Sequence, residues 1–478
     1  MKTLLKIVLA ITIPMVFSCS SDDTVSPVLF NPFVGDVLLE SQTEVDDFAS
    51  NNYSEINGNL RISAPDLSGP SSITDLSGLA SILSVNGDIE IFSNSITSLQ
   101  GLEGITGISG SLFISFNPDL VEINALSNVE TIGGDISITS QDNLVNIDGL
   151  SGITTVPGAL NIGANIGSGA LDLPKLSNLN GLSQITSVGG DVQVSGTNVT
   201  NLKGLEGISE VDGNVTISFN PSLTSVQGLQ NVATVSGDFV LTQNPELQDV
   251  DGLIGLQEVE GNFEISSNDS LSDTDGLATI TRVGENLTVF LNTNLIDLGA
   301  GFSNLESVFS LFITDGGLVQ ISQFNSLTEV FSITISNNTD LITLSGFEGL
   351  TKVGALSIIE NNTLAEISGF DVLANATIVE INQPITTADS AIEITGFSNL
   401  TTIGNRIIIN GLANEHIDFL SSIQQVGGNV NISNNENLAD FCGLNPLIFG
   451  GGLGGNLNAF QNLYNPTIQD ILNGNCSL

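Results

Sequence analysis

The feature that most constrains this chain is a short internal repeat. The segment Gly213-Asn-Val-Thr-Ile-Ser-Phe-Asn is followed 24 residues later, at Gly237, by Gly-Asp-Phe-Val-Leu-Thr-Gln-Asn. A unit this short cannot bury its apolar side chains alone, so successive units must stack. Corresponding starts, mostly 22 to 24 residues apart, fall at Gly58, Gly87, Gly110, Gly134, Gly158, Gly190, Gly213, Gly237, Gly261, Glu285, Phe309, Phe331, Gly354, Ala376, Asn405 and Gly428.

Each unit predicts one coil of parallel β-structure. Val215 and Ile217 alternate with polar residues as in a short strand, and further apolar residues recur at Leu223, Val226 and Leu229. Gly, Ser, Thr and Asn at the corners leave no sustained helical pattern. We therefore expect an all-β parallel solenoid of about 16 coils of 22–24 residues, which is a rod of roughly 75 Å at about 4.8 Å per coil.

An Asn usually stands close behind each predicted strand. A turn that closes every coil buries backbone groups, and an inward Asn side chain can pair with them. We expect a structural Asn ladder along the rod, with a sugar site as the alternative. Its members are Asn94, Asn117, Asn165, Asn220, Asn244, Asn268, Asn292, Asn338, Asn361 and Asn435.

The sequence predicts a cap at each end of the array, because the first and the last coil would otherwise expose a strand edge. Ser41 followed by apolar Val45 and Phe48 is typical of one short helix, which gives an N-terminal cap over 41–57 and a repeat array over 58–440. Residues 441–478 form the C-terminal cap, with a second short helix expected near 466–473.

The N-terminus has the layout of a secretory signal, with Lys2 and Lys6 ahead of an apolar run over 7–17. The run ends at Cys19 and Ser-Ser-Asp-Asp, which resembles a bacterial lipoprotein signal and the acidic surface tag of Bacteroidota lipoproteins. That resemblance implies a signal peptide over 1–18, an acylated Cys19 with a flexible tether over 19–40, and an outer-membrane, cell-surface address. An ordinary signal peptide with a coincidental cysteine is the alternative.

Cys442 and Cys476 are expected to form a disulfide, because an exported chain meets an oxidising compartment. Closing this loop would stabilise the cap by roughly 3 to 4 kcal/mol in the chain-entropy model. The alternative is a catalytic thiol, for which His416, the one His in the chain, would have to act as the base.

The repeat unit, with its φ-x-φ strand, Asn, Leu, Gly-Leu and Ile-x-x-Val-x-Gly, resembles the receptor L-domain, a leucine-rich-repeat-like fold. Similar repeats occur in surface proteins of Bacteroidota. The resemblance covers residues from about 45 to 440. It implies a right-handed solenoid and an extracellular binding scaffold. It does not imply growth-factor binding, because the Cys-rich modules between receptor lobes are missing here.

Charge excludes one class of partner. Asp and Glu number 52 against 8 Lys and Arg, so the net charge is −44, and it becomes −46 once residues 1–18 with their two lysines are removed. Nucleic acid binding needs cationic contacts to phosphate, so no nucleic acid partner is expected. Calcium could bind opportunistically to the carboxylates, although no known loop motif for it is present.

Catalysis is not expected, and neither is a cofactor. A polysaccharide-degrading β-helix enzyme is the catalytic alternative, but the bases of the exported chain fall in different coils, at Arg61, Lys175, Lys203, Arg282, Lys352 and Arg406. Acid pairs could act as general acid and base, yet they are common in so acidic a chain. They stand at Asp249/Asp251, Glu258/Glu260 and Asp273/Asp275.

Two features could carry recognition. One is an outward row of hydroxyls, which β-propensity alone could also explain, at Ser115, Thr139, Ser195, Ser218, Thr242, Ser266, Thr314, Ser336 and Ser433. The other is a pair of long-coil loops, 165–174 and 382–390, because insertions in a solenoid form loops on one side. We expect a lipid-anchored scaffold that binds an extracellular protein or glycan, with a structural envelope spacer as the alternative.

Overall fold

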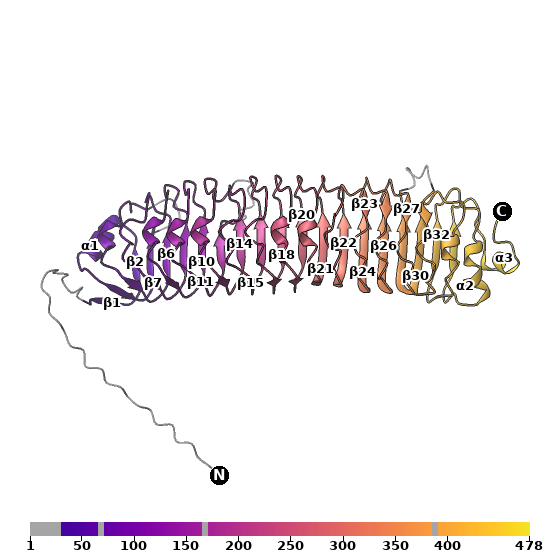
Figure 1. Cartoon of the computed structure of the whole chain (residues 1–478), viewed down its shortest axis with the longest axis horizontal. Coiled ribbons are helices and arrows are strands. Elements are labelled where there is room, and N and C mark those ends of the chain that lie inside the picture. The colour runs from indigo at the N-terminus through magenta and orange to yellow at the C-terminus, as the bar shows by residue number, and fades with distance from the viewer. Residues whose placement is uncertain (1–29, 66–70, 165–170, 385–390) are drawn as a thin grey trace, which may run out of the picture.

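The computed structural model describes residues 30–65, 71–164, 171–384 and 391–478. The chain is a parallel β-solenoid of about 17 turns, which confirms the all-β solenoid predicted from the repeat. It forms a long rod with helix α1 (Gln42–Ala49) at one end and helices α2 (Asn445–Phe449) and α3 (Ile468–Leu472) at the other (Figure 1).

One main sheet runs the length of the rod, with one parallel strand from each coil. Equivalent residues of successive coils pair, as Thr216 does with Val240 and Val240 with Glu264, so side chains form rows along the rod. Its strands are β2 (Val37–Leu39), β4 (Leu60–Ser63), β6 (Ile89–Phe92), β8 (Leu112–Ser115), β10 (Ile136–Thr139), β12 (Leu160–Ile162), β14 (Val192–Ser195), β16 (Val215–Ser218), β18 (Phe239–Thr242), β20 (Phe263–Ser266), β21 (Arg282–Phe290), β22 (Ser307–Thr314), β24 (Glu329–Ser336), β26 (Lys352–Ile359), β28 (Asn375–Asn382), β30 (Thr402–Asn410), β32 (Val430–Ser433) and β33 (Leu457–Phe460).

Shorter strands complete the coils. A row that precedes the main strands consists of β1 (Pro32–Val34), β3 (Glu55–Asn57), β5 (Ser84–Val85), β7 (Gly107–Ile108), β9 (Thr131–Ile132), β11 (Thr155–Val156), β13 (Ser187–Val188), β15 (Glu210–Val211), β17 (Thr234–Val235), β19 (Glu258–Val259) and β31 (Gln425–Val426). A separate sheet towards the C-terminus consists of β23 (Gln320–Ile321), β25 (Thr343–Leu344), β27 (Glu366–Ile367) and β29 (Glu393–Ile394).

Two kinds of coil follow one another. In the coils over 32–281, which we name the cornered coils, a sharp corner separates a short strand from the main strand, as Ser236-Gly237-Asp238 separates β17 from β18. In the coils over 282–410, which we name the straight coils, one strand of eight or nine residues runs through that corner. After residue 410 the corner returns, between β31 and β32.

An Asp/Asn ladder holds the corners of the cornered coils. Asn214 Oδ1 accepts the backbone N–H of Asp238 at 2.8 Å, and Asp238 Oδ1 accepts that of Asn262 at 2.7 Å. Gly237 leaves room for this contact, because a Cβ there would overlap Asn214 Oδ1. In the straight coils Ser310, Ser332, Ala355 and Ile378 stand at this position and pair through their backbones instead.

The core is a continuous column of aliphatic side chains, and the straight coils add a stack of buried Phe rings. Outside the straight coils, most coils place a buried Leu at the end of a 3-10 turn. These turns are found at Ser77–Leu79, Asn124–Leu126, Asp148–Leu150, Asn180–Leu182, Asp251–Leu253, Asp275–Leu277, Asp418–Leu420 and Cys442–Leu444. In the straight coils the position holds Phe, with ring centroids 4.9 to 5.9 Å apart. The stack consists of Phe302, Phe324, Phe347, Phe370 and Phe397.

The first coil begins earlier than the repeat count suggested. Residues 32–39, expected in the tether over 19–40, form β1 and β2, which pair with β3 and β4. The physical reason is that Gly35-Asp36-Val37 is the same corner motif, and Asp36 Oδ1 accepts the N–H of Asn59 at 2.9 Å. Helix α1 follows, capped by Ser41, and it buries Val45.

The C-terminal cap contains one further strand. Within 441–478, β33 pairs in parallel with β32 and so extends the array past residue 440. Helix α3 is where the second short helix was expected, and the Thr467 side chain caps its N-terminus. Cys442 and Cys476 form a disulfide with Cα atoms 4.9 Å apart, which ties the last residues to the cap.

Candidate functional site

The Asn side chains behind the main strands lie inside the rod and hydrogen-bond from coil to coil. Asn244 is fully buried, and its Oδ1 accepts the N–H of Asn220 at 3.2 Å. Its Nδ2 donates to the carbonyl oxygens of Ile217 and Thr242 at 3.1 and 3.0 Å. The row therefore pairs backbone groups that the turn would otherwise leave buried and unpaired, which is the structural role expected for it.

The residue before most ladder positions has a left-handed backbone. Phe219 and Gln243 have φ of 57° and 56°, a conformation that costs a non-glycine residue on the order of 1–2 kcal/mol. The turn is nevertheless kept in coil after coil. The hydrogen bonds of the ladder amides offset this strain.

Some ladder members are not Asn, and a search for Asn alone misses them. Gln141 Oε1 accepts the N–H of Asn117, and Thr197 Oγ1 donates to Asn220 Oδ1. A further member is an Asn in the C-terminal cap, beyond the predicted array: Asn462 Oδ1 accepts the N–H of Asn435. A polar side chain one residue after the left-handed position would have identified them. Asn165 lies outside the described residues.

The ladder is interrupted at Gln383. Gln383 Oε1 accepts the N–H of Asn361 at 2.9 Å, which fixes the orientation of the amide. On the next coil, the ladder position after Gly411 is occupied by Leu412, which has no side-chain oxygen. Gln383 is only 6% exposed, and within the described part of the chain its Nε2 has no hydrogen-bond partner.

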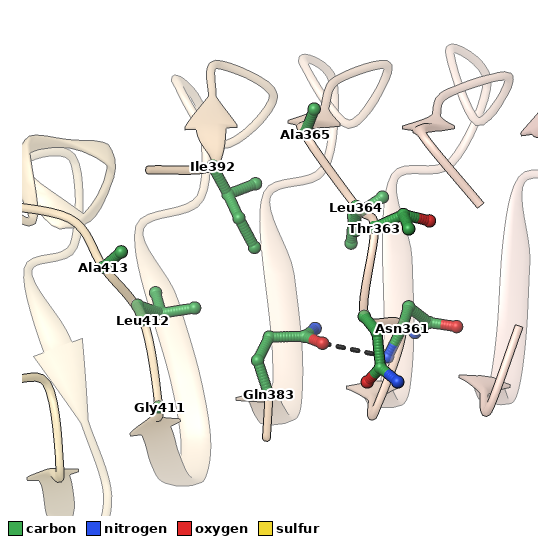
Figure 2. Close-up of a pocket in the computed structure, with 10 residues that line it drawn as sticks. Asn361, Thr363, Leu364, Ala365, Gln383, Ile392, Gly411, Leu412 and Ala413 are labelled. Atoms are coloured by element: carbon green, nitrogen blue, oxygen red, sulfur yellow. Dashed lines mark hydrogen bonds between the residues drawn. The ribbon is translucent and has the colours of Figure 1, made fainter. Parts of the chain in front are cut away.

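A cavity of about 250 Å³ opens at this interruption and is partly open to solvent. Figure 2 shows Gln383 and Ile392 of the middle coil between the segment 361–365 on one side and Gly411–Ala413 on the other. Its walls include Leu364, Ile392 and Leu412, which are all nearly buried. We name this cavity the slot.

An exposed aliphatic row leads to the slot. Ile296, Val319 and Ile342 are 58%, 37% and 47% exposed and lie on three successive coils. The Val319 N–H donates to the Ile296 carbonyl, and the Ile342 N–H donates to the Val319 carbonyl. Ala365, on the rim of the slot, donates to the Ile342 carbonyl and continues the row. We name Ile296, Val319 and Ile342 the ridge.

The ridge differs from the coils just before it at the same position. On the three coils before it, the same place carries the exposed polar residues Thr224, Gln248 and Ser272. Nearer the N-terminus Val121 and Val145 are also exposed there. An apolar row on successive coils of so acidic a rod is the kind of surface that contacts a partner.

The predicted outward hydroxyl row is partly wrong. Ser195, Ser218 and Ser266 are only 1–3% exposed. The reason is that these hydroxyls pair from coil to coil: Ser195 Oγ lies 2.8 Å from Ser218 Oγ, and Thr242 Oγ1 lies 2.6 Å from Ser266 Oγ. The row is therefore not a continuous free surface for a ligand.

Acidic residues have two structural consequences here. Some Asp side chains hold the corners, as Asp238 does. Others crowd together on the cornered coils, where desolvation, followed by the nearby charges of Asp249, Asp273 and Asp275, raises the pKa of Asp251 above its ordinary value. These aspartates form two of the acid pairs noted in the sequence, and their charges repel one another.

Three of the bases pair with glutamates of an adjacent coil. Arg61 lies 3.4 Å from Glu90, and Lys352 lies 3.3 Å from Glu329. Arg282 pairs with Glu258 in the same way. These ion pairs link coils, and they are spread along the rod as the sequence suggested.

The disulfide of the C-terminal cap bears on both the catalytic-thiol and the metal expectations. Because both sulfurs are in the disulfide, the catalytic-thiol alternative with His416 is wrong for Cys442 and Cys476. Asp440 lies beside them within 4.8 Å, but bonded sulfurs leave it as a lone carboxylate for a cation. Opportunistic calcium binding stays a prediction.

Several sequence predictions fall on residues outside the described ranges. These are the signal peptide over 1–18, Cys19, and most of both long-coil loops, at 165–170 and 385–390. Among the helices of the described residues, none has the length and apolar character needed to cross a membrane.

Comparisons with known proteins add little. No protein-family model matches the chain, and no curated protein matches it. Among solved structures, the chain is similar to a TLR13–ssRNA13 complex at 12% sequence identity, over 92% of this chain and 69% of that one, with a TM-score of 0.25. At this TM-score the likeness supports no inference about the present chain.

Proposed function

We propose that this chain is a non-catalytic binding scaffold that recognises a protein, held by a lipid on Cys19 at the outer face of the outer membrane. The observation that carries the binding role is the ridge. Exposed aliphatic side chains at the same place on three coils provide a dry contact that a protein partner would cover. The lipoprotein-like N-terminus supports the address.

A protein partner fits this surface better than a glycan. Sugar sites commonly use aromatic stacking, whereas the ridge consists of Ile296, Val319 and Ile342. The net charge of −44 also opposes an anionic polysaccharide. Catalysis has little support, because three of the bases are engaged in ion pairs between coils.

The binding role is tested by photocrosslinking in living cells, with a photoreactive residue at position 319 and a control at 272, the corresponding polar position on a cornered coil. Protein adducts at 319 and few at 272 are expected. Equal adducts at both positions would contradict a specific site, and adducts at neither would favour the envelope spacer. Adducts that a glycosidase removes would point to a glycan instead.

The address is tested by protease shaving of intact cells, with a blot for the C-terminal cap and a periplasmic protein as the lysis control. The solenoid can resist proteases, so a protease site is inserted near residue 30. We expect the wild-type chain to be cleaved there, and Cys19→Ala to leave the membrane fraction. Protection of the inserted site in intact cells, with cleavage after lysis, would contradict surface display.

A further inference from the structure

Two exposed phenylalanines stand side by side at the corner of the straight coils, which we name the aromatic pair. Phe309 of β22 and Phe331 of β24 are 48% and 62% exposed. Their rings stack with centroids 4.7 Å apart and 8° between the planes, so each ring covers one face of the other. Both strands belong to the main sheet, where β22, β24 and β26 follow one another along the rod (Figure 1). Exposed apolar groups that gather on a surface mark a contact site.

A glycine on the next coil leaves the outer face of Phe331 uncovered. The register of β24 with β26 places Gly354 beside Phe331, and the register of β26 with β28 places Thr377 beyond it. Phe331 and Thr377 are therefore two coils apart, which is about 9.6 Å. Gly354 has no side chain to stand between them, so a flat group about one coil thick fits against the ring.

Polar side chains form the neighbouring outward row on the same three coils. Glu329, Lys352 and Asn375 pair in register, and all three are exposed. Lys352 Nζ lies 3.3 Å from a carboxylate oxygen of Glu329, so a cation and an anion are held side by side. A hydroxyl group can accept a hydrogen bond from the ammonium and donate one to the carboxylate. This row therefore complements a neutral group that carries several hydroxyls.

The flat face and the polar row together restrict the ligand. The π electrons of a Phe ring attract the weakly positive hydrogens of C–H bonds, so the ring favours a ligand with C–H bonds across its face. An aromatic side chain of a partner would leave the polar row without hydrogen bonds, and an arginine would meet the Lys352 ammonium. The net charge of −44 disfavours an acidic sugar. A neutral sugar ring meets all these conditions.

We propose that the open face of Phe331 binds a neutral pyranose of an extracellular glycan, with its hydroxyls bonded to the row of Glu329 and Lys352. A β-glucoside, whose ring hydroxyls are all equatorial, presents flat C–H faces and fits best. This site goes beyond the proposed protein-binding function, because the main strand separates the aromatic pair from the ridge. On β22, for example, Phe309 stands near the start and Val319 follows the end.

The test uses the purified full-length chain with ¹³C-labelled phenylalanine rings, whose NMR signals report on a stacked ligand. The probe is methyl β-D-glucopyranoside, compared with methyl β-D-glucuronide, which carries a carboxylate, and with Ac-Phe-NH2, which offers an aromatic ring. The glucoside is expected to shift the Phe331 signals, which Phe331→Ala identifies by their loss, and to leave those of the buried Phe347 unchanged. The other two probes should bind at least about tenfold more weakly.

Two pairs of variants at exposed positions locate the contact. Phe331→Leu keeps an apolar side chain but loses the flat face, whereas its control, Phe331→Tyr, keeps the face. Lys352→Met removes the ammonium, and its control is Lys203→Met, at an exposed lysine of a cornered coil. We expect Phe331→Leu and Lys352→Met to weaken glucoside binding at least about fivefold, and both controls to bind as the wild type does.

Three results would overturn the proposal. They are wild-type glucoside affinity in Phe331→Leu, equal or tighter binding of Ac-Phe-NH2 or the glucuronide, and no Phe331 shift at about 50 mM glucoside. If any of these came with protein adducts at position 319 in cells, the sugar site would be wrong and the protein-binding function would stand. The expected shifts in a chain that gives no adducts at 319 would support the sugar site and contradict the proposed partner surface.

Discussion

Between β18 and β24 the rod changes how one coil is joined to the next. In the cornered coils a side chain makes the junction, because Asp238 reaches forward and accepts an N–H from the following coil. In the straight coils the backbone makes it, through strands such as β24 that pair along their length. One repeat can therefore close its coils either with side chains or with longer strands.

The core also differs between the cornered coils and the straight coils. Leu253 and its equivalents on the cornered coils fill the core from 3-10 turns, whereas the straight coils stack Phe rings almost in parallel, with 10° between Phe347 and Phe370. The ridge and the slot both lie along the straight coils or at their ends. The ridge and the slot thus lie where the strands are longer, whereas the cornered coils just before them carry polar residues at the place of the ridge.

The largest expected effect comes from the Phe stack. Phe347 is fully buried between Phe324 and Phe370, so Phe347→Ala should lower the free energy of unfolding by about 3–5 kcal/mol through the cavity it leaves. Denaturant unfolding measures the loss, and hydrogen exchange should show it concentrated in the straight coils. The control is Phe331→Ala, whose ring is 62% exposed, with an expected loss under about 1 kcal/mol. Similar losses in both would contradict a stabilising stack.

A glycine tests the corner directly. Gly237→Ala places a Cβ on Asn214 Oδ1 and should displace the ladder contact, at a cost of about 2–3 kcal/mol. Gly404→Ala, on a straight coil, meets no atom closer than 3.7 Å and should change stability by under about 0.5 kcal/mol. Thermal unfolding of the two variants side by side measures the difference, and equal values would argue against the corner as the sensitive point.

Removing the ladder acid has a smaller effect. Asp238→Ala leaves the N–H of Asn262 without its acceptor and should cost about 1–1.5 kcal/mol by denaturant unfolding. Ser332→Ala at the corresponding position of a straight coil should cost under about 0.5 kcal/mol, since backbone pairing continues there. A larger loss for Ser332→Ala would reverse the distinction between the two kinds of coil.

The smallest effect concerns the crowded acids of the cornered coils. Because the pKa of Asp251 is raised in the folded chain, its ionised form disfavours folding at neutral pH, and stability recovers as the pH falls through that pKa towards the ordinary value of 3.8. Asp251→Asn should therefore stabilise by under about 1 kcal/mol at pH 7, since exposed charges are screened.

The pH profile makes that last prediction specific. The gain from Asp251→Asn should shrink below about pH 4 and at high salt, as followed by thermal unfolding across pH. Asp340→Asn, which removes one exposed carboxylate on a straight coil away from this cluster, is the matched control. A gain that persists below pH 3.8 would point to a cause other than charge.

The repeat predicted the fold well because apolar spacing and corner residues recur in almost every coil. The first coil was missed although Gly35-Asp36-Val37 carries the corner motif, because the residues before 41 looked like a tether. The role of the corner acid was also missed. Gly-Asp and Gly-Asn marked the start of each unit, but only the three-dimensional stacking reveals that Asp238 bonds to the next coil.

The slot could not be predicted from the sequence in the same way. Gln383 and Leu412 are unremarkable singly, and only the stacking of the coils shows that Gln383 Nε2 has no acceptor among the described residues. Hydrogen bonds between coils join residues about 24 apart, so a residue's own neighbours in the chain do not indicate its partners. The ridge residues each stand directly after a buried Leu of the repeat, at the place that is polar on the preceding coils. An alignment of the repeats therefore contained this row, but it was not singled out from the sequence.

The forward reach of each corner acid has a consequence for how such a rod changes length. Asn214 needs only a Gly and a backbone N–H on whatever coil comes next, and each cornered coil offers both at its start. Removing residues 213–236 would present Asp191 with Gly237 and Asp238, the same junction that it now makes with Gly213 and Asn214. Whole cornered coils are therefore interchangeable units that gene duplication or deletion can add or drop in phase, whereas a cut within a coil, or a splice between the two kinds, breaks a junction.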